Sequence, residues 1–344
     1  MKKIRVLFPR VEAGYGHIMT CNAVEEIFSK KYGDKVDVVN CTFYDEAKNK
    51  RLIAFSNFLK RSVRRYTSNP LYGHYMGFSS KFWGKKLSLY ATMRMVVPGS
   101  FKPGVELMES MKPDVVFSTH WATNYYAEHM EKKPFTVLYC PDVTLDNLFK
   151  SKADLSMCGM ERGYIDAIDD PNYNSSNLKL VKFCIRNEAF KVKETKEESR
   201  KKLGIPLDKF CVVLTDGGYG YGHSKEVVRQ LIKEDIPITV IPICGTNEKL
   251  LEAYKKMKPS KSITFLPQGF TKDIFSFINA ADLFSGKSGN MIAEPTFFGV
   301  PSLITSTSTI IESDIAKFYR DYVHCAIKEK NPKKAVRLIK RFAL

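Results

Sequence analysis

The chain has 344 residues, of which 44% are hydrophobic, and its formal net charge at pH 7 is +17. This length exceeds the size at which one hydrophobic core usually keeps growing, so two domains are expected. No window holds eighteen uninterrupted apolar residues and the apolar part of the N-terminus is short, which argues against a spanning helix and a signal peptide.

The first structural signal is a strand followed by a glycine loop and a helix. Residues 4–8 form an apolar run that predicts a strand, and residues 19–32 have helical spacing. The loop between them contains Gly14 and Gly16 and ends in His17. Glycine is needed where a backbone turns sharply or approaches a ligand closely, and a helix start offers unpaired N–H groups to an anion. This loop is therefore a candidate ligand site.

Residues 36–40 predict a second strand, after which the chain becomes strongly basic and aromatic. Between positions 46 and 106 there are twelve basic residues and no acidic one, and we call this segment the basic window. Apolar residues recur at three- and four-residue spacing over 52–63 with cations around them, which predicts a basic amphipathic helix. An anionic membrane surface is the expected partner; a merely solvated face or single-stranded nucleic acid are the alternatives. The residues assigned to this surface are Arg61, Arg64, Arg65, Phe82 and Trp83.

Strands and helices alternate through the rest of the first half. Residues 105–111 predict a helix, and 113–118 and 135–140 predict strands, which together indicate a mainly parallel sheet. His120 follows the first of these strands, where it either lines a ligand site or packs at the strand end. A polar stretch at 169–177 is a candidate start of a linker.

The second half repeats the pattern of the first. An apolar run at 211–214 leads into a glycine loop at 216–223, and further strands are predicted at 238–243, 263–266 and 300–304. Two Rossmann-like halves that face a phosphorylated ligand are the economical interpretation. We expect an N-terminal domain at 1–180 and a C-terminal domain at 186–330. Residues 331–344 predict an amphipathic helix, for which packing back on the N-terminal domain is one arrangement.

Residues 286–294 carry the most specific ligand signal. The turn at 286–290 is small enough for backbone donors to reach a diphosphate, and Glu294 lies where a carboxylate could bind two ribose hydroxyls. The loop at 217–222 does not fit Gly-x-Gly-x-x-Gly, so a nicotinamide cofactor is poorly supported. The sequence has no Asp-x-Asp motif, no Cys-x-x-Cys pair and no zinc-spaced cluster, so neither a metal nor a cofactor is expected.

Several segments together resemble the GT-B glycosyltransferases that form glycolipids. They are Ala13-Gly14-Tyr15-Gly16-His17, Gly217-Gly218-Tyr219-Gly220, Gln268-Gly269-Phe270-Thr271, Ala280-Ala281-Asp282, Lys287-Ser288-Gly289-Asn290 through Glu294, and Gly299-Val300-Pro301. The sequence is most similar to monogalactosyldiacylglycerol synthases and processive diacylglycerol glucosyltransferases, and more distantly to the peptidoglycan N-acetylglucosaminyltransferase. The resemblance implies an α/β fold of the GT-B class, with two Rossmann-like domains whose parallel sheets face a central cleft.

The resemblance also implies a role for each matching residue. Phe270 with Thr271 would hold the base and Glu294 the ribose. His17 would be the general base that deprotonates the acceptor hydroxyl, a task to which imidazole is well matched. The other residues assigned to the donor nucleotide are Gly217, Gly218, Tyr219, Gly220, Asn247, Ser288, Gly289 and Asn290. Gly14, Gly16 and His120 are assigned to the acceptor side.

Three segments depart from the family pattern. Asp142 alone is retained from a Thr-Asp loop, and we assign it to catalysis. Arg186 stands in place of a Gly-Ile-Pro linker and is a candidate contact to the donor phosphates. Glu312 ends a Thr/Ser-rich run where members of the family usually touch the donor sugar, so the sequence leaves the identity of that sugar open.

We therefore expect an inverting hexosyltransferase that takes a UDP-sugar as substrate and glycosylates a lipid such as diacylglycerol. Its expected location is cytoplasmic, peripheral on the inner face of the cell membrane, and nucleic acid is not an expected partner. A UDP-sugar epimerase of the same fold is the second hypothesis; it would act without lipid and would not need the basic window. A non-enzymatic protein that binds anionic membranes or nucleic acid is the third, but it leaves the nucleotide loops unexplained. The acceptor, the number of sugars added and the oligomeric state stay open, as does whether the departures abolish or redirect activity.

Overall fold

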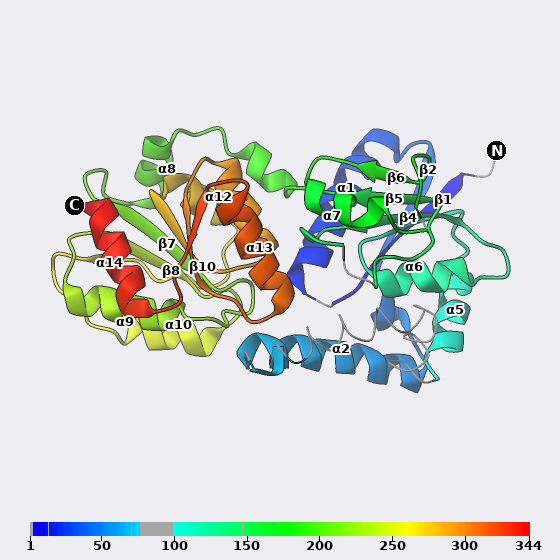
Figure 1. The fold of residues 1–344 in the computed structure, drawn as a ribbon, viewed down its shortest axis with the longest axis horizontal. Helices are drawn as coiled ribbons and strands as arrows, with labels where there is room; N and C mark the ends of the chain where they lie inside the picture. Colours follow the sequence, from blue (N-terminus) through cyan, green and yellow to red (C-terminus); the bar gives the residue numbers. More distant parts are fainter. Residues whose placement is uncertain are drawn as a thin grey trace. The chain divides into compact units, whose positions relative to one another are not determined.

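The computed structural model describes residues 3–12, 14–69, 71–73, 75, 99–145, 148–171 and 173–344, and for residues 15, 63, 64 and 66–68 it describes the backbone alone. The chain forms two compact units (Figure 1). The first comprises Met1–Tyr66 and Leu71–Arg186, and the second comprises Thr67–Pro70 and Asn187–Leu344. Each unit is built on one six-stranded sheet, which confirms the predicted pair of Rossmann-like sheets. Phe82 and Trp83, which we assigned to the membrane surface, lie outside the described residues.

The sheet of the first unit has the strand order β2-β1-β3-β4-β5-β6, and its neighbouring strands are all parallel. The strands are β1 (Ile4–Arg10), β2 (Val36–Thr42), β3 (Val115–Ser118), β4 (Phe135–Cys140), β5 (Leu155–Cys158) and β6 (Leu178–Leu180). The helices in this part of the chain are α1 (Tyr15–Tyr32), α2 (Lys50–Ser68), α5 (Phe101–Ser110), α6 (Trp121–Glu128) and α7 (Glu161–Ile168), with a 3-10 turn, η1, at Phe43–Glu46.

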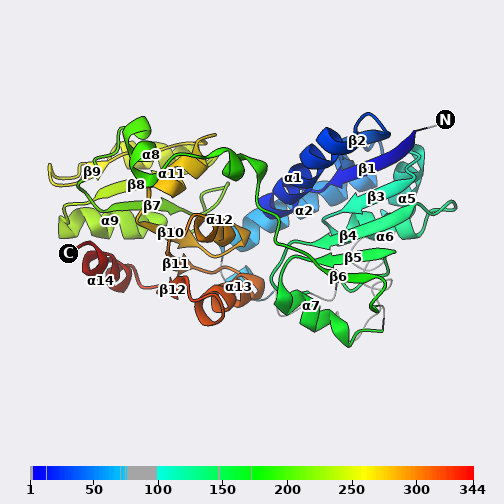
Figure 2. The same cartoon turned by 90° about the horizontal axis from the view of Figure 1, so that it is seen from above.

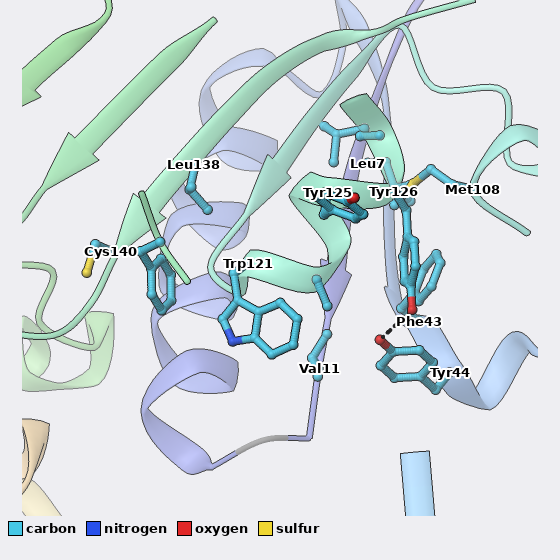
Figure 3. Close-up of a cluster of buried hydrophobic side chains, with 14 of the residues drawn as sticks. Leu7, Val11, Phe43, Tyr44, Met108, Trp121, Tyr125, Tyr126, Leu138 and Cys140 are labelled. Carbon is cyan, nitrogen blue, oxygen red and sulfur yellow. Dashed lines mark hydrogen bonds between the residues drawn. The ribbon is translucent and has the colours of Figure 1, made fainter. Parts of the chain in front are cut away.

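Alternate residues of β1 enter two different cores, because successive side chains of a strand point to opposite faces. Val6 and Phe8 pack with residues of α1 on one face. Leu7 packs on the other face in a cluster that includes residues of α5 and α6. Figure 3 shows this second cluster, in which the hydroxyl groups of Tyr44 and Tyr126 lie 3.4 Å apart. Burial of both faces is the usual state of a parallel sheet.

The sheet of the second unit has the order β12-β11-β10-β7-β8-β9, again with parallel neighbours. Its strands are β7 (Cys211–Thr215), β8 (Thr239–Ile243), β9 (Thr264–Phe265), β10 (Leu283–Lys287), β11 (Ser302–Ser306) and β12 (Ala326–Lys328). Its helices are α8 (Lys196–Leu203), α9 (Ser224–Glu234), α10 (Glu248–Lys255), α11 (Ile274–Ala280), α12 (Ala293–Phe297), α13 (Ile310–Asp321) and α14 (Pro332–Ala343), with 3-10 turns η2 at Asn187–Lys191 and η3 at Asn290–Ile292. Figure 2 shows helices on both faces of this sheet.

One sequence expectation about the ends of the domains is corrected, and the terminal helix is assigned to a core. The polar stretch at 169–177 is not the start of a linker, because it leads into β6, which pairs with β5 in the first sheet. The terminal helix α14 packs within the second unit. Its buried residues Ala335, Val336 and Ile339 belong to the core of the second unit, where α14 lies against α9.

In the part of the chain that the structure describes, no helix combines the length and the apolar character that crossing a bilayer requires.

Candidate functional site

Ligands of open α/β sheets bind at the carboxyl ends of the strands. In the first unit the neighbouring strands β1, β3 and β4 end at the same edge of the sheet. The loops that follow them carry Glu12 and Gly14, then Thr119 and His120, and then Asp142 and Phe149. Residues far apart in the sequence are thereby gathered at one edge.

Gly14 is the N-cap of α1, four residues after the end of β1. Its φ of +123° lies in the region that side-chain-bearing residues rarely adopt, while a Cβ built on it would meet nothing within 4 Å. Glycine is therefore required at this position because of the backbone conformation, and not because a side chain would lack space. Gly16 and His17 follow in the first turn of the helix.

His17 is fixed in one tautomer by a neighbouring strand end. Its Nδ1 lies 2.7 Å from the backbone carbonyl oxygen of Thr119, and the Thr119 hydroxyl donates in return to the His17 carbonyl at 2.9 Å. A carbonyl oxygen only accepts hydrogen bonds, so Nδ1 carries the hydrogen in the neutral ring. The lone pair is then on Nε2, which is the arrangement a general base requires.

Two aromatic rings hold the imidazole of His17 in place. Phe149 stacks on it with the ring centroids 6.0 Å apart, and His120 meets it edge-on at 5.3 Å. His120 is only 3% exposed, and its Nδ1 accepts from the Ala122 N–H, which caps α6. Burial, aided by the nearby His17, holds the pKa of His120 well below its usual value. The structure thus places His120 beside His17 as a buried helix cap, and its acceptor role stays a prediction.

Asp142 lies at the same edge. Within the ranges that the structure describes, no hydrogen bond connects Asp142 with His17. The aspartate is half-buried in the loop after β4, where its backbone carbonyl accepts a weak hydrogen bond from the Cys140 thiol. Its catalytic role stays a prediction.

Helix α2 confirms the amphipathic pattern predicted over the start of the basic window. Leu52 and Phe55 are buried in the first core, whereas Ile53, Phe58 and Arg61 are exposed. Arg65 is also exposed and lies over the ring of Tyr72, 4.6 Å from its centroid. The side chain of Arg64 lies outside the described residues. The outer face of α2 therefore combines large apolar side chains with cations.

An ion-pair network connects α2 to the loop before α1. The Lys60 ammonium pairs with the Glu12 carboxylate and, at 3.4 Å, with Asp45. The hydrogen bond to Glu12 is the main cause of a raised pKa of Lys60. Glu12 lies two residues before Gly14, so the basic helix is tied to the loop that positions His17.

In the second unit, glycines allow the loops after β7 and β8 to pack against each other. Gly217, Gly220 and Gly245 all have positive φ, and a Cβ on Gly245 would lie 2.3 Å from the carbonyl oxygen of Gly218. The backbone N–H and the hydroxyl of Thr246 both donate to that carbonyl. The predicted donor loop 217–220 is thus held in a tight, glycine-dependent conformation.

Asn247 has a structural task at this loop. Its side-chain oxygen caps α10 by accepting from the Leu250 N–H at 3.0 Å, and its amide nitrogen donates to the carbonyl oxygens of Tyr219 and Gly220. A direct contact of Asn247 with a nucleotide stays a prediction.

The turn after β10 depends on a close approach between strands. A Cβ on Gly286 would lie 1.8 Å from the carbonyl oxygen of Thr215 in β7, so this position must be glycine. The ladder to β11 is irregular between Gly286 and Lys287, after which Ser288 donates its N–H to Ser306 at 2.9 Å. Gly289 and Asn290 then start the 3-10 turn η3 that precedes α12.

The residues assigned to the base and ribose differ in exposure. Phe270 is 65% exposed after β9, and Thr271 accepts from the Asp273 N–H just before α11. An exposed ring of this kind can stack on a base. Glu294 lies in the first turn of α12 and is 9% exposed, so its carboxylate is mostly enclosed by protein. The nucleotide contacts of all three residues stay predictions.

The remaining predicted donor residues are Arg186 and Glu312. Arg186 is half-buried and is the last residue of the first unit. Glu312 lies in the first turn of α13, where its carboxylate accepts from the Ser308 N–H at 2.5 Å and pairs with the Lys287 ammonium at 2.7 Å.

The sequence analysis did not assign a role to Lys287, or to Thr119 and Phe149 of the first unit. Each of them lies at or after the end of a strand, and this position could have identified them as candidate site residues.

Comparison with known proteins confirms the resemblance stated from the sequence. The chain is 25% identical over 324 residues to monogalactosyldiacylglycerol synthase 3 of Arabidopsis thaliana, covering 87% of this chain and 66% of the plant protein. It is 22% identical over 148 residues to the processive diacylglycerol beta-glucosyltransferase of Bacillus pumilus, which covers 43% of this chain and 38% of that protein. No protein-family model matches the chain.

A third relative is the pyrophosphoryl-undecaprenol N-acetylglucosamine transferase of Acetivibrio thermocellus, 31% identical over 157 residues, or 43% of this chain and 41% of that protein. The chain therefore spans less than two thirds of the length of these relatives.

Solved structures with the same fold include a UDP complex of MnaA from S. aureus, with a TM-score of 0.62, 13% identity and coverage of 99% of this chain and 88% of that chain. MurG of Acinetobacter baumannii has a TM-score of 0.55 at 11% identity and covers 98% of this chain and 90% of that chain. At these identities the likeness establishes the fold alone. The predicted GT-B class, with its two parallel sheets, is confirmed.

Proposed function

We propose that this protein is an inverting glycosyltransferase that moves a hexose from a UDP-sugar to a hydroxyl group of a membrane lipid. The second unit would bind the donor, and the first would supply His17 to the acceptor. The names of the sequence relatives support transfer to diacylglycerol or to an undecaprenol-linked acceptor. The observation that carries the assignment is the 2.7 Å contact of His17 Nδ1 with the Thr119 carbonyl, which leaves Nε2 as the basic atom.

The chemistry needs one base and one site for the leaving group. His17 Nε2 takes the proton of the acceptor hydroxyl as its oxygen attacks the anomeric carbon, and the bond from that carbon to the diphosphate oxygen breaks. Attack from the opposite face inverts the configuration. Backbone N–H groups of the glycine loops at 217–220 and 288–290 would stabilise the charge that develops on UDP.

The outer face of α2 supports membrane docking. Exposed Ile53 and Phe58 would enter the headgroup region while Arg61 and Arg65 meet anionic lipids. Each cation near such a surface contributes about 1 kcal/mol at moderate salt, so several together suffice for reversible docking. Arg61→Glu should weaken sedimentation with phosphatidylglycerol vesicles at least fivefold, whereas Lys233→Glu on α9 makes the same charge change and should leave it unaltered.

The decisive assay combines UDP-glucose, UDP-galactose or UDP-N-acetylglucosamine with vesicles that contain diacylglycerol and phosphatidylglycerol. We expect UDP release and a glycolipid product only when both the donor and the lipid are present. Interconversion of free UDP-sugars without lipid would establish the epimerase instead. That alternative stays open because a solved putative UDP-N-acetylglucosamine 2-epimerase of Listeria monocytogenes has the same fold. Failure to bind any uridine nucleotide in calorimetry would overturn both enzymatic hypotheses.

A further inference from the structure

A polar cluster lies where β10 and β11 end, next to the predicted diphosphate turn. Lys287 is the last residue of β10, and its ammonium pairs with the Glu312 carboxylate at 2.7 Å. The two side chains are only 11% and 13% exposed. Asp216 directly follows β7. Burial raises the pKa of its carboxyl, and hydrogen bonds with Ser224 and then the charge of Lys287 partly offset this rise. Lys287 is thus a largely enclosed cation at the ligand edge of the sheet.

Three hydroxyl groups in this cluster are buried and have no hydrogen-bond partner among the described residues. They belong to Ser288, Ser306 and Thr307, which are 2%, 4% and 4% exposed. Ser288 and Ser306 are joined backbone to backbone at 2.9 Å, and Thr307 comes two residues before the N-cap of α13. A buried polar group without a partner costs about 1–3 kcal/mol. Buried hydroxyls without a partner call for an explanation, and a bound polar group is one that would satisfy all three.

Glu312 occupies the place that an anionic ligand would take here. Its carboxylate receives the Lys287 ammonium and the Ser308 N–H at the start of a twelve-residue helix. An ammonium group, a backbone N–H and a helix N-terminus are the groups that bind phosphate in proteins. Glu312 could instead serve only to cap helix α13, since Thr309 accepts a hydrogen bond from the Glu312 N–H at 3.0 Å. Capping, however, does not require a charge on Glu312, whereas the ion pair with Lys287 does require it.

We propose that Lys287 binds the diphosphate of the donor and that Glu312 is an internal competitor that holds the lysine until the donor arrives. The inference rests on the proposed function, because it takes the donor to carry a diphosphate. Donor binding would transfer Lys287 from the carboxylate to a phosphate oxygen, with the buried hydroxyls completing the contacts. This replaces the sequence-based role of Glu312 as a partner of the sugar.

The test is calorimetric titration of the full chain with UDP, and with uridine as a probe that lacks phosphate. Glu312→Gln keeps an oxygen for the Ser308 N–H but removes the charge that competes for Lys287. We expect this variant to bind UDP at least about fivefold more tightly. Fivefold is the lower end of the affinity changes that coupled equilibria usually produce in proteins. Uridine affinity should not change.

A matched control is Glu252→Gln, which removes the same charge from an exposed pair with Lys255 on α10 and should leave UDP affinity unaltered. Lys287→Met should weaken UDP binding at least tenfold and abolish the gain from Glu312→Gln in the double variant. Lys287→Gln, which also removes the charge but keeps a polar side chain, replaces it if the methionine variant does not fold. Unchanged or weaker UDP binding by Glu312→Gln would overturn this inference alone. Absence of UDP binding by the unaltered chain would overturn the proposed function as well.

Discussion

At the scale of single residues, the tautomer of His17 is the feature on which catalysis is argued. The hydrogen bond that sets it joins residues 102 positions apart, so no local pattern could reveal it. The sequence does identify the histidine, because it ends a glycine loop at a helix start. Its partner Thr119 and the stacked Phe149 emerge only when β1, β3 and β4 are aligned in one sheet.

Replacing His17 with alanine should slow turnover without weakening donor binding. A positioned general base contributes about 10²- to 10⁴-fold to the rate, so a loss of kcat in that range is expected. The affinity for UDP, measured by calorimetry, should be unchanged because the donor loops lie in the other unit. His324→Asn, at an exposed position with positive φ that asparagine tolerates, is the control. Ordinary turnover by the alanine variant would remove His17 from the mechanism.

His120 should make the protein less stable at mildly acidic pH. Burial holds the pKa of the folded histidine well below 6.5, whereas the unfolded chain takes up a proton near that value. As the pH falls below about 6.5 the unfolded state binds more protons, so the free energy of unfolding decreases, by at most about 1.4 kcal/mol per pH unit. Above that pH this contribution does not vary.

Urea unfolding at pH 7, 6 and 5.5 measures this effect. His120→Asn keeps a side-chain acceptor for the Ala122 N–H but cannot titrate. The variant is expected to lose less stability over this interval than the unaltered protein, whatever its stability at pH 7. Equal losses in the two proteins would show that His120 is not the group responsible.

At the scale of elements, the sequence predicts the strands with uninterrupted apolar runs and misses four others. Of these, β5, β6 and β12 are short, and β6 and β12 lie at sheet edges where burial is incomplete. The strand β10 is missed for another reason. Its end, Gly286 and Lys287, has the composition of a loop, and only the pairing of Gly286 with β7 and β11 shows that the glycine belongs to a strand.

Two glycines of this segment should respond differently to alanine. In Gly286→Ala the new methyl group would lie 1.8 Å from the Thr215 carbonyl, so β10 and β7 must separate. We expect a loss of about 3 kcal/mol or more in the free energy of unfolding, the upper end of overpacking effects. Gly289→Ala meets nothing within 4 Å and has an extended φ of 166°, so it should cost less than about 1 kcal/mol. Similar losses for both, in denaturant titrations, would contradict the predicted packing of β10.

At the scale of the whole molecule, the sequence predicts two Rossmann-like units, but it cannot assign the terminal helix to one of them. The spacing of α14 shows an apolar face without showing which core receives it. In the structure, Ala335, Val336 and Ile339 complete the second core beside α9. This assignment matters for the proposed function, because it makes α14 part of the unit that would hold the nucleotide.

Calorimetric melting can test that assignment together with donor binding. The two units have separate cores, so two unfolding transitions are expected, and UDP at 100 times its dissociation constant should stabilise the unit that binds it by about 2.7 kcal/mol. Ile339→Ala removes a fully buried side chain from α14 and should cost about 2–5 kcal/mol in the transition that UDP raises. Met108→Ala, equally buried in the first core, should lower the other transition. If Ile339→Ala instead lowers the transition that does not respond to UDP, either α14 or the nucleotide site has been assigned to the wrong unit, and the response to Met108→Ala decides which.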